Sequence, residues 1–220
     1  MQITTKWVQL IAIIPLTVGA LVTATLTLNL FNKEINSRLQ SVRKTLEENI
    51  KNELEARITT TYGFIQTCYL HGKTDQECLQ RLGTMRFGEN DANYLWIHLL
   101  DPENIANAFF QSHPRTDMLG KNLAGMVDLD LVDNIYHQGE IYKKSELMVS
   151  SIKSTNVFFA FNKVALESGQ GIVYYYWPKA IPGQPSKTGY PKMSYIKYFE
   201  PFKWVIGAGE YADVIDELVN

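Results

Sequence analysis

The chain has 220 residues, a formal net charge of −2 and 12% aromatic residues. A chain of this size can bury one proper hydrophobic core, and its slightly acidic balance creates no basic field that would attract nucleic acid. Composition therefore favours one globular domain and argues against a nucleic-acid partner.

Residues 7–31 form an unbroken run without a charged side chain, WVQLIAIIPLTVGALVTATLTLNLF. About 20 apolar residues match the hydrocarbon core of a bilayer, roughly 30 Å thick, at about 1.5 Å of rise per residue. The run is longer than the apolar part of a secretory signal, and no convincing small-x-small cleavage site follows it. We therefore predict a membrane-spanning helix at 7–31 behind a cytoplasmic leader of residues 1–6, with a cleaved signal as the less favoured alternative.

Basic residues lie mostly after this run, so charge alone does not settle the orientation. A short leader fits the inside, and large domains are translocated largely regardless of charge. Cys68 and Cys78 are the only cysteines, and an even count close in sequence suits one disulfide in an exported domain. We therefore place the domain outside the membrane and predict that the two cysteines are bonded, with two unrelated buried thiols as the alternative.

An apolar stripe at helical spacing follows the membrane run, from Ile35 to Ile65, opposite a charged face. It predicts a long helix from 32 to about 70 that continues the membrane helix and stops near Gly72. The segment Thr74 to Glu77 has the pattern of a capping box and predicts a short second helix that ends before Gly88. Residues 32–87 are thus expected to form two helices, linked by the disulfide.

After Gly88 the apolar period changes to two, which is typical of strands. Residues 131–168 lack proline and indicate a crossover of one or two helices, with 157–161 also compatible with a strand. A loop rich in proline and glycine follows at 178–191, and a short helix is expected at 212–219. The predicted strands are 93–100, 105–113, 172–177, 192–199 and 204–211. This order predicts that residues 88–220 form the core of an α+β domain with a five-stranded antiparallel sheet.

Patterns that would indicate catalysis are not found. The four histidines are scattered, without the spacing of a zinc site, so we expect no metal. The sequence has no Gly-x-Ser-x-Gly motif and no glycine-rich phosphate loop. We therefore expect neither an enzyme nor a cofactor.

Aromatic side chains alternate on two predicted strands. Tyr94 and Trp96 share one face of the first strand, and Tyr175 and Trp177 share one face of the third. Large rings with donor groups suit a small pocket, although each residue is equally compatible with an ordinary core face. Cationic side chains close to these strands, gathered around such a pocket, would bind a small anion, whereas each alone would be a solvated charge. They are His113, Arg115, Lys179 and Lys192.

Four segments in this order resemble the single Cache family of extracellular sensor domains, which are relatives of PAS domains in bacterial chemoreceptors, sensor kinases and cyclases. The segments are NYLWIHLLDPEN, QSHPRTDMLGKNLAG, GQGIVYYYWPKA and YPKMSYIKYFEPFKWVIGAGEY. The similarity spans roughly Gly88 to Tyr211, and the stretch 130–169 looks longer than the usual crossover. The resemblance implies a PAS-like five-stranded sheet, with the long helix along it and a pocket between sheet and loops.

The resemblance also implies a ligand, typically a small carboxylate such as acetate, propionate, pyruvate or lactate, or another small polar molecule such as urea. Gly207 and Gly209 would be positions where the backbone is closely approached. By position, the aromatic lining falls on Tyr94, Trp96, Tyr175 and Trp177. The contacts to the polar head group fall on His113, Lys192 and Tyr195, with Arg115, Lys121 and Lys179 as weaker candidates.

We therefore predict a non-enzymatic sensor in the inner (plasma) membrane, with its domain on the periplasmic or extracellular side. It would bind a small carboxylate, signal through its helices and form a homodimer. Such receptors normally continue into a second span and a cytoplasmic output module, and the sequence leaves open whether this chain is part of one or signals through a partner. The alternative is a ligand-independent protein-interaction or assembly module of an exported complex. A hydrolase is not favoured, because it would need a nucleophile or metal that the sequence does not show.

Overall fold

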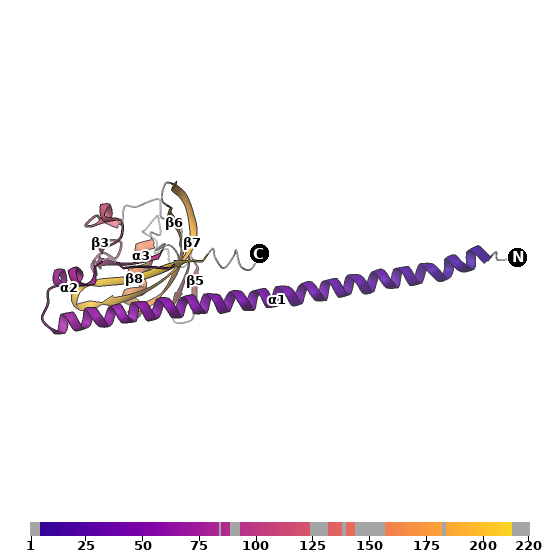
Figure 1. Ribbon diagram of the computed structural model, residues 1–220, viewed down its shortest axis with the longest axis horizontal. Coiled ribbons are helices and arrows are strands. Elements are labelled where there is room, and N and C mark those ends of the chain that lie inside the picture. Colours follow the sequence, from indigo (N-terminus) through magenta and orange to yellow (C-terminus); the bar gives the residue numbers. More distant parts are fainter. Residues whose placement is uncertain are drawn as a thin grey trace. The chain divides into compact units, whose positions relative to one another are not determined.

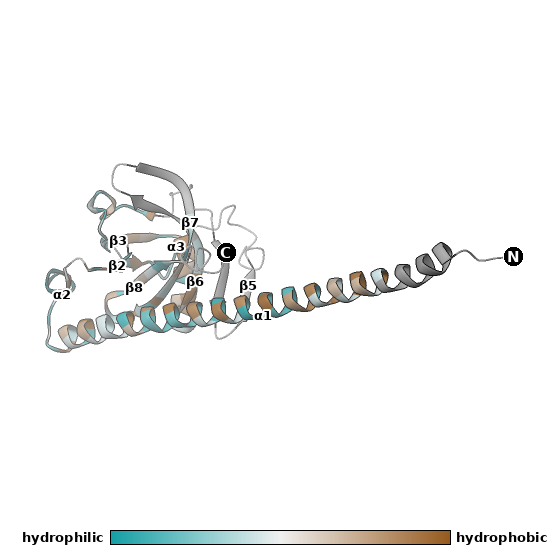
Figure 2. Ribbon diagram, turned by 45° about the vertical axis from the view of Figure 1, so that its right-hand side comes forward, coloured by the Kyte–Doolittle hydropathy of each residue, from teal (hydrophilic) through white to brown (hydrophobic). Residues whose placement is uncertain are grey.

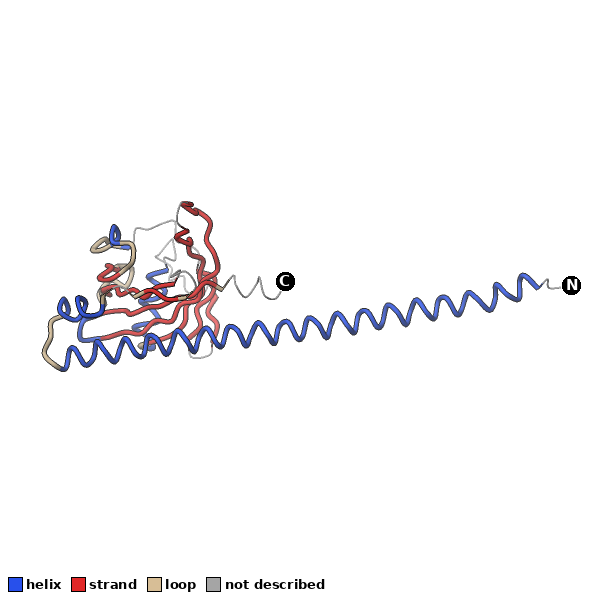
Figure 3. The backbone as a smooth tube through the Cα atoms, viewed as in Figure 1, coloured by secondary structure: helices blue, strands red, loops and turns tan. Residues whose placement is uncertain are grey.

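The computed structural model describes residues 5–83, 85–88, 93–123, 132–137, 140–143, 157–181 and 184–212, and side chains are described except for 5–16, 132–143, 176 and 178–189. The chain divides into two compact units, one of which ends at Leu46, while the other begins at Glu47. Helix α1, Thr5–Leu70, contributes to both units. Figure 3 shows this helix and the strands of the second unit.

Helix α1 confirms the predicted continuity of the helix from residues 7–31 through the apolar stripe. Leu54, Ile58 and Ile65 are fully buried, as their spacing of four and seven residues predicts for one helix face. Figure 2 shows apolar and polar residues sharing the turns of α1 that run along the sheet. Within the described residues, no helix has a stretch long and apolar enough to cross a membrane. The predicted span includes residues 7–16, whose side chains lie outside the description, and it stays a prediction.

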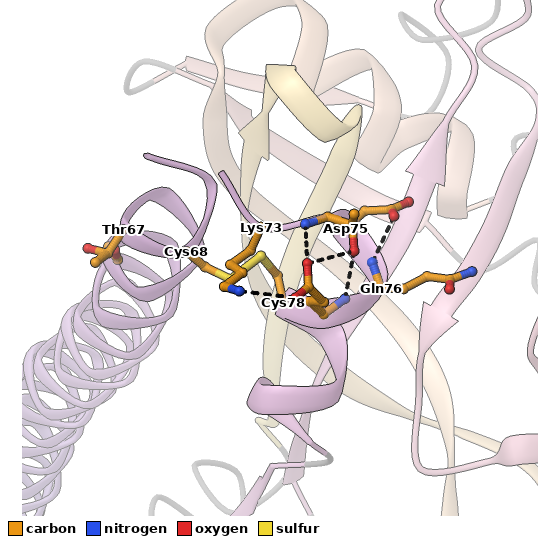
Figure 4. Close-up of a disulfide and its surroundings, with 9 residues drawn as sticks. Thr67, Cys68, Lys73, Asp75, Gln76 and Cys78 are labelled. Carbon is orange, nitrogen blue, oxygen red and sulfur yellow. Dashed lines mark hydrogen bonds and ion pairs between the residues drawn. A yellow bond between two sulfur atoms is a disulfide. The ribbon is translucent and has the colours of Figure 1, made fainter. Parts of the chain in front are cut away.

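Helix α2, Asp75–Leu82, begins at the predicted capping box. The Thr74 hydroxyl accepts a hydrogen bond from the Glu77 amide at 3.2 Å, and the Glu77 carboxylate accepts one from the Thr74 amide at 2.9 Å. Figure 4 shows the disulfide between Cys68 and Cys78. Their α-carbons are 5.9 Å apart. The predicted pairing is therefore confirmed, and it ties the end of α1 to α2.

The described part of the chain forms one antiparallel sheet of eight strands, in the order β1-β2-β8-β7-β6-β4-β5, with β3 paired to β2. Helix α3, Val157–Ser168, precedes β6, and two short 3-10 helices, η2 (Thr116–Met118) and η5 (Glu200–Phe202), precede β4 and β8. The strands are β1 (Arg86–Phe87), β2 (Asn93–Leu100), β3 (Ala108–Ser112), β4 (Val132–His137), β5 (Glu140–Lys143), β6 (Gln170–Ile181), β7 (Gln184–Phe199) and β8 (Trp204–Tyr211). The α+β class and the antiparallel sheet are confirmed, and β2 and β8 have the predicted bounds.

Two segments differ from the prediction. The expected helical crossover at 131–168 holds strands β4 and β5 before helix α3, because β4 pairs with the outer edge of β6. The expected loop at 178–191 is the tip of a hairpin in which β6 and β7 pair as far as Ile181 and Gln184. Proline has no amide proton to donate to a neighbouring strand. It is tolerated at this tip because, in the described residues, no further strand pairs with the outer side of either hairpin strand there. Strands β1, β4 and β5 raise the strand count of the described residues from the predicted five to eight, and the hairpin tip lengthens β6 and β7.

The sheet buries a different core on each face. On the first face, here called the α1 face, Leu54 and Ile58 of α1 pack against Ile97, Met193 and neighbouring strand residues. On the second, here called the α3 face, helix α3 packs against Trp96 and Tyr175. Figure 1 shows the part of α1 that belongs to the second unit running along the strands. The predicted helix at 212–219 lies outside the described residues apart from its first residue.

Candidate functional site

The α3 face carries a cluster of polar and aromatic groups at one end of β2, β7 and β8. Lys192 of β7 lies opposite Tyr211 of β8, and Tyr94 of β2 lies opposite Gly209 of β8. Because Gly209 has no side chain, the Lys192 side chain can cross β8 towards β2. A Cβ added at Gly209 would lie 2.8 Å from Cε of Lys192 and would overlap the hydroxyl of Ser194. The predicted close backbone approach at this glycine is therefore confirmed.

Lys192 is the central cation of this cluster. Its side chain is 1% exposed, and Nζ lies 4.3 Å from the ring centroids of both Tyr94 and Tyr211. Nζ has no hydrogen-bond partner among the described residues. Burial lowers the pKa of the amine from 10.5 to about 7, an effect that the nearby carboxylate of Glu210 opposes. The rings attract a cation at their faces, but they do not replace the hydrogen bonds that water would provide.

His113 follows β3 and reaches the same cluster. Its ring is 4% exposed, stacks on Phe110 at 4.3 Å and meets Tyr94 edge to face at 4.8 Å between centroids. Nδ1 accepts a hydrogen bond from the Arg115 amide at 2.9 Å. Burial and the charge of Lys192 lower the pKa of this imidazole to about 4. The ring is therefore neutral at pH 7, and since Nδ1 is an acceptor, its proton is on Nε2.

Two tryptophans extend the cluster. The indole of Trp96 lies against Gly207, where an added Cβ would overlap the ring, and its Nε1 has no hydrogen-bond partner among the described residues. The Trp177 side chain hydrogen-bonds to that of Tyr94, whose pKa is nevertheless raised to about 12 by burial. The Tyr175 hydroxyl lies 2.8 Å from the Ser194 hydroxyl. The predicted aromatic residues thus share the α3 face.

Helix α3 covers this face with two phenylalanines. Phe161 lies 5.3 Å from Trp96 and 5.4 Å from Tyr175 between ring centroids. Phe158 lies 6.2 Å from Trp177. These contacts exclude water from the rings, so a charge placed among them interacts more strongly than it would at the surface.

A buried hydrogen-bond network holds α3 in place. The Asn162 amide donates to the carbonyl oxygens of Ile105 and Asn107, both at 2.9 Å, and its Oδ1 lies 2.8 Å from Nε2 of His98. Burial lowers the pKa of His98 to about 4, so this imidazole is neutral and donates to Asn162. The network joins α3 to β2 and to the turn that follows it.

Three predicted site residues do not join the cluster, and a fourth lies outside the described side chains. Tyr195 lies on the α1 face, where its hydroxyl interacts with Glu55. Arg115 is exposed and pairs with Asp117 at 2.8 Å, and Lys121 is also exposed. The side chain of Lys179 lies outside the described residues. The prediction of a head-group contact at Tyr195 is wrong in placement, since a residue three positions after Lys192 on a strand faces the other side.

The sequence analysis did not include several residues of the cluster. Tyr211 could have been found from the alternation of Gly207, Gly209 and Tyr211 along β8, which puts all three on one face. Phe158 and Phe161 were not included because the helix that carries them was not firmly assigned. Among the described residues, no group of His, Cys, Asp and Glu could hold a metal ion.

The cluster is therefore rich in donors and poor in acceptors. Lys192, Nε2 of His113 and Nε1 of Trp96 can each donate a hydrogen bond, and aromatic rings surround them. This combination suits a small anion with an apolar part, since hydrogen bonds to a charged acceptor are about twice as strong as neutral ones.

Comparison with known proteins gives the family. A Cache domain family model matches residues 27–220. The methyl-accepting chemotaxis protein McpP of Pseudomonas putida is 29% identical over 141 residues, which cover 63% of this chain and 19% of that protein. The chain thus spans about a fifth of the length of that relative.

Solved structures share the fold. A methyl-accepting chemotaxis protein from Vibrio parahaemolyticus aligns with a TM-score of 0.56 and 22% identity, over 81% of this chain and 99% of the other. A periplasmic sensor domain of a chemotaxis protein aligns with a TM-score of 0.50 and 21% identity, over 76% of this chain and 96% of the other. These likenesses show the shared fold, and the family match over residues 27–220 shows that the chain belongs to the Cache domain family.

Proposed function

We propose that this chain is the sensor part of a membrane-anchored chemoreceptor and that it binds a small carboxylate against Lys192. The observation that carries the proposal is the Lys192 amine, which is buried, close to cation-attracting rings, and without a hydrogen-bond partner among the described residues. Leaving such a group unpaired is costly, and a carboxylate would provide both the acceptor and the opposite charge. A short-chain acid is favoured over a larger one, because a larger ligand would displace more of the rings that bury this amine.

The relatives support a role in sensing. McpP is a chemotaxis protein by name. The Cache domain family model matches residues 27–220, which contain this cluster. The Cys68–Cys78 disulfide supports a location outside the cytoplasm, since such bonds persist in oxidising compartments. We therefore propose the periplasmic or extracellular side of the plasma membrane.

Membrane anchoring is proposed for the helix over residues 7–31. In the described part of that segment, large apolar side chains are exposed on several sides of α1, which suits a lipid environment. They are Val18, Leu21, Val22, Leu26, Leu28, Leu30 and Phe31. The same helix continues to the α1 face of the sensor domain, so a ligand that favours one position of α1 over another would transmit a signal along it.

A dimer through α1 is proposed as well, because Ile35 and Val42 are exposed apolar residues of the predicted stripe. Single cysteines introduced at Leu39 or Leu46 should crosslink to a second copy in membranes. Monomers alone at both positions would contradict the dimer.

The ligand proposal is tested on the whole chain in a mild detergent. Calorimetry and thermal shift are measured with acetate, propionate, pyruvate and lactate, with urea and ethylamine as uncharged and cationic comparisons. We expect an acid to bind and Lys192→Met to weaken binding by about one to two decades, since a charge-assisted hydrogen bond contributes about 1.5–3 kcal/mol.

Lys197→Met is the matched control. Lys197 lies on the same strand, and its Nζ is also near a tyrosine ring, 4.5 Å from Tyr62, but it is on the α1 face. Its replacement should leave the affinity nearly unchanged. Equal losses at both lysines would indicate general electrostatic attraction, and binding of none of the acids would favour the assembly-module alternative.

A further inference from the structure

We infer that Lys192 takes up a proton when an acidic ligand binds, so that the site responds to pH and to ligand together. The inference rests on the proposed function, because it needs a carboxylate next to Lys192. It concerns regulation of that site and follows from the groups around the amine.

None of the described groups that face Lys192 on the α3 face carries a compensating negative charge. Tyr94 from β2 and Tyr211 from β8 present ring faces to Nζ. Tyr94 stays a neutral phenol at pH 7, because burial raises its pKa to about 12. His113, which follows β3, is neutral, and its proton on Nε2 makes it a donor that does not stabilise an ammonium group.

The remaining neighbours also leave the charge uncompensated. Ser194 and Tyr175 bond to each other, and the pKa of Tyr175 is raised by burial, so neither is an anion. Glu210 is the carboxylate that favours the charged amine, but it precedes Tyr211 on β8 and therefore faces α1. There, burial and Glu53 raise its own pKa, while Arg57 and Lys192 lower it.

In the free protein the amine therefore loses its proton near pH 7, well below its ordinary value of 10.5. An arriving carboxylate provides the missing negative charge and favours the ammonium form. The lone pair of Nζ accepts a proton from solvent, the resulting ammonium group pairs with the ligand carboxylate, and no other bond changes. Wherever the free amine is neutral, one carboxylate and one proton bind together.

The linkage has a defined pH range. With the amine half protonated near pH 7 in the free protein, binding should take up about 0.1 proton at pH 6, about 0.5 at pH 7 and about 0.9 at pH 8. The affinity should be nearly constant below pH 6 and fall about tenfold between pH 6 and pH 8, because the neutral amine must first be protonated.

The experiment is calorimetry of the whole chain in detergent with pyruvate, whose carboxyl group stays ionised throughout this range. Titrations in phosphate and in Tris, whose ionisation enthalpies differ, give the number of protons taken up. In parallel, the Lys192 ε-carbon signal of protein labelled with 13C-lysine gives the titration midpoint of the free amine, assigned with Lys192→Arg.

Lys192→Arg keeps a positive charge at every pH, so it should bind pyruvate without proton uptake and without the tenfold decline. Lys197→Met should retain both effects. Binding at pH 8 with no proton uptake by the wild-type chain would overturn the inference and leave the proposed function intact. A titration midpoint near 10 for the free amine would do the same without any ligand, and failure of pyruvate and the three other acids to bind at any pH would overturn both.

Discussion

Replacing Lys192 by methionine should stabilise the folded protein, and more so at low pH than at high pH. Methionine has a similar length and keeps the apolar contacts of the lysine stem, but it has no amine to desolvate. The folded environment lowers the pKa of Lys192 from 10.5 to about 7. Between these two pH values the unfolded chain holds a proton that the folded chain lacks, so the stability of the wild type rises with pH across this range.

The size of the effect follows from this shift. Each unit of pKa difference corresponds to about 1.4 kcal/mol. Burial of Lys192 therefore costs about 4–5 kcal/mol at pH 6, where the amine is charged, and about 2 kcal/mol at pH 9, where it must give up its proton. The stability advantage of Lys192→Met should therefore shrink by about 2–3 kcal/mol between pH 6 and pH 9. Attraction between the ammonium group and the rings of Tyr94 and Tyr211 reduces the absolute gain, since it is lost in the variant.

Urea unfolding of the whole chain in detergent, followed by tryptophan fluorescence, measures these differences. Lys197 is half-buried on the other face of the same strand. The stability difference between Lys197→Met and the wild type should not change in this way between pH 6 and pH 9. If Lys192→Met is less stable than the wild type at pH 6, or if its advantage does not change with pH, the amine is not an uncompensated buried base and the reasoning fails.

Two further expectations concern packing and the disulfide. Gly207→Ala should destabilise the protein by about 1–3 kcal/mol, because the new methyl group overlaps the Trp96 indole. Gly63→Ala should stabilise the protein by about 0.5–1 kcal/mol, because this position in α1 has open space around it. The two variants should shift Tm in opposite directions. Replacing Cys68 and Cys78 together by serine should cost about 2.5 kcal/mol, since a 10-residue loop is released in the unfolded chain. An unchanged urea midpoint would contradict the second expectation.

Local patterns were sufficient where one strong signal dominated. The capping box located α2 because two reciprocal hydrogen bonds specify its first turn. Strands β2 and β8 were predicted with their observed bounds, since alternation and turn residues at both ends agree there. These elements needed no information about their neighbours.

Strands β4 and β5 could not be predicted in the same way. Each has six residues or fewer, and each is a strand because a partner is available, β6 for β4 and β4 for β5. Strand preference depends strongly on such neighbours, so a short segment with a patchy pattern is compatible with a helix until its partner is known. The hairpin tip at 178–191 was missed for the related reason that proline is tolerated at a free edge.

The sequence predicted which face of the sheet the aromatic residues share more reliably than it predicted which residues belong to the cluster. Alternation correctly grouped Tyr94 with Trp96 and Tyr175 with Trp177. Tyr195 was included because of its position in the family resemblance. It lies three residues after Lys192, so the alternation of side chains along the strand would have excluded it. When a site residue is assigned from a family resemblance, the alternation of side chains along the strand should therefore be used to check that the residue lies on the correct face.

The geometry of the cluster depends on two glycines of β8, Gly207 and Gly209, which have no side chain. This strand lies between β2 and β7, so ordinary residues at 207 and 209 would fill the space above it. Trp96 enters that space from β2 over Gly207, and Lys192 enters it from β7 over Gly209. The amine can therefore be buried far from solvent without a partner from its own strand. Gly207 and Gly209 alternate on a central strand, with Trp96 and Lys192 on its two neighbours. This arrangement explains why an unpaired amine lies in this core.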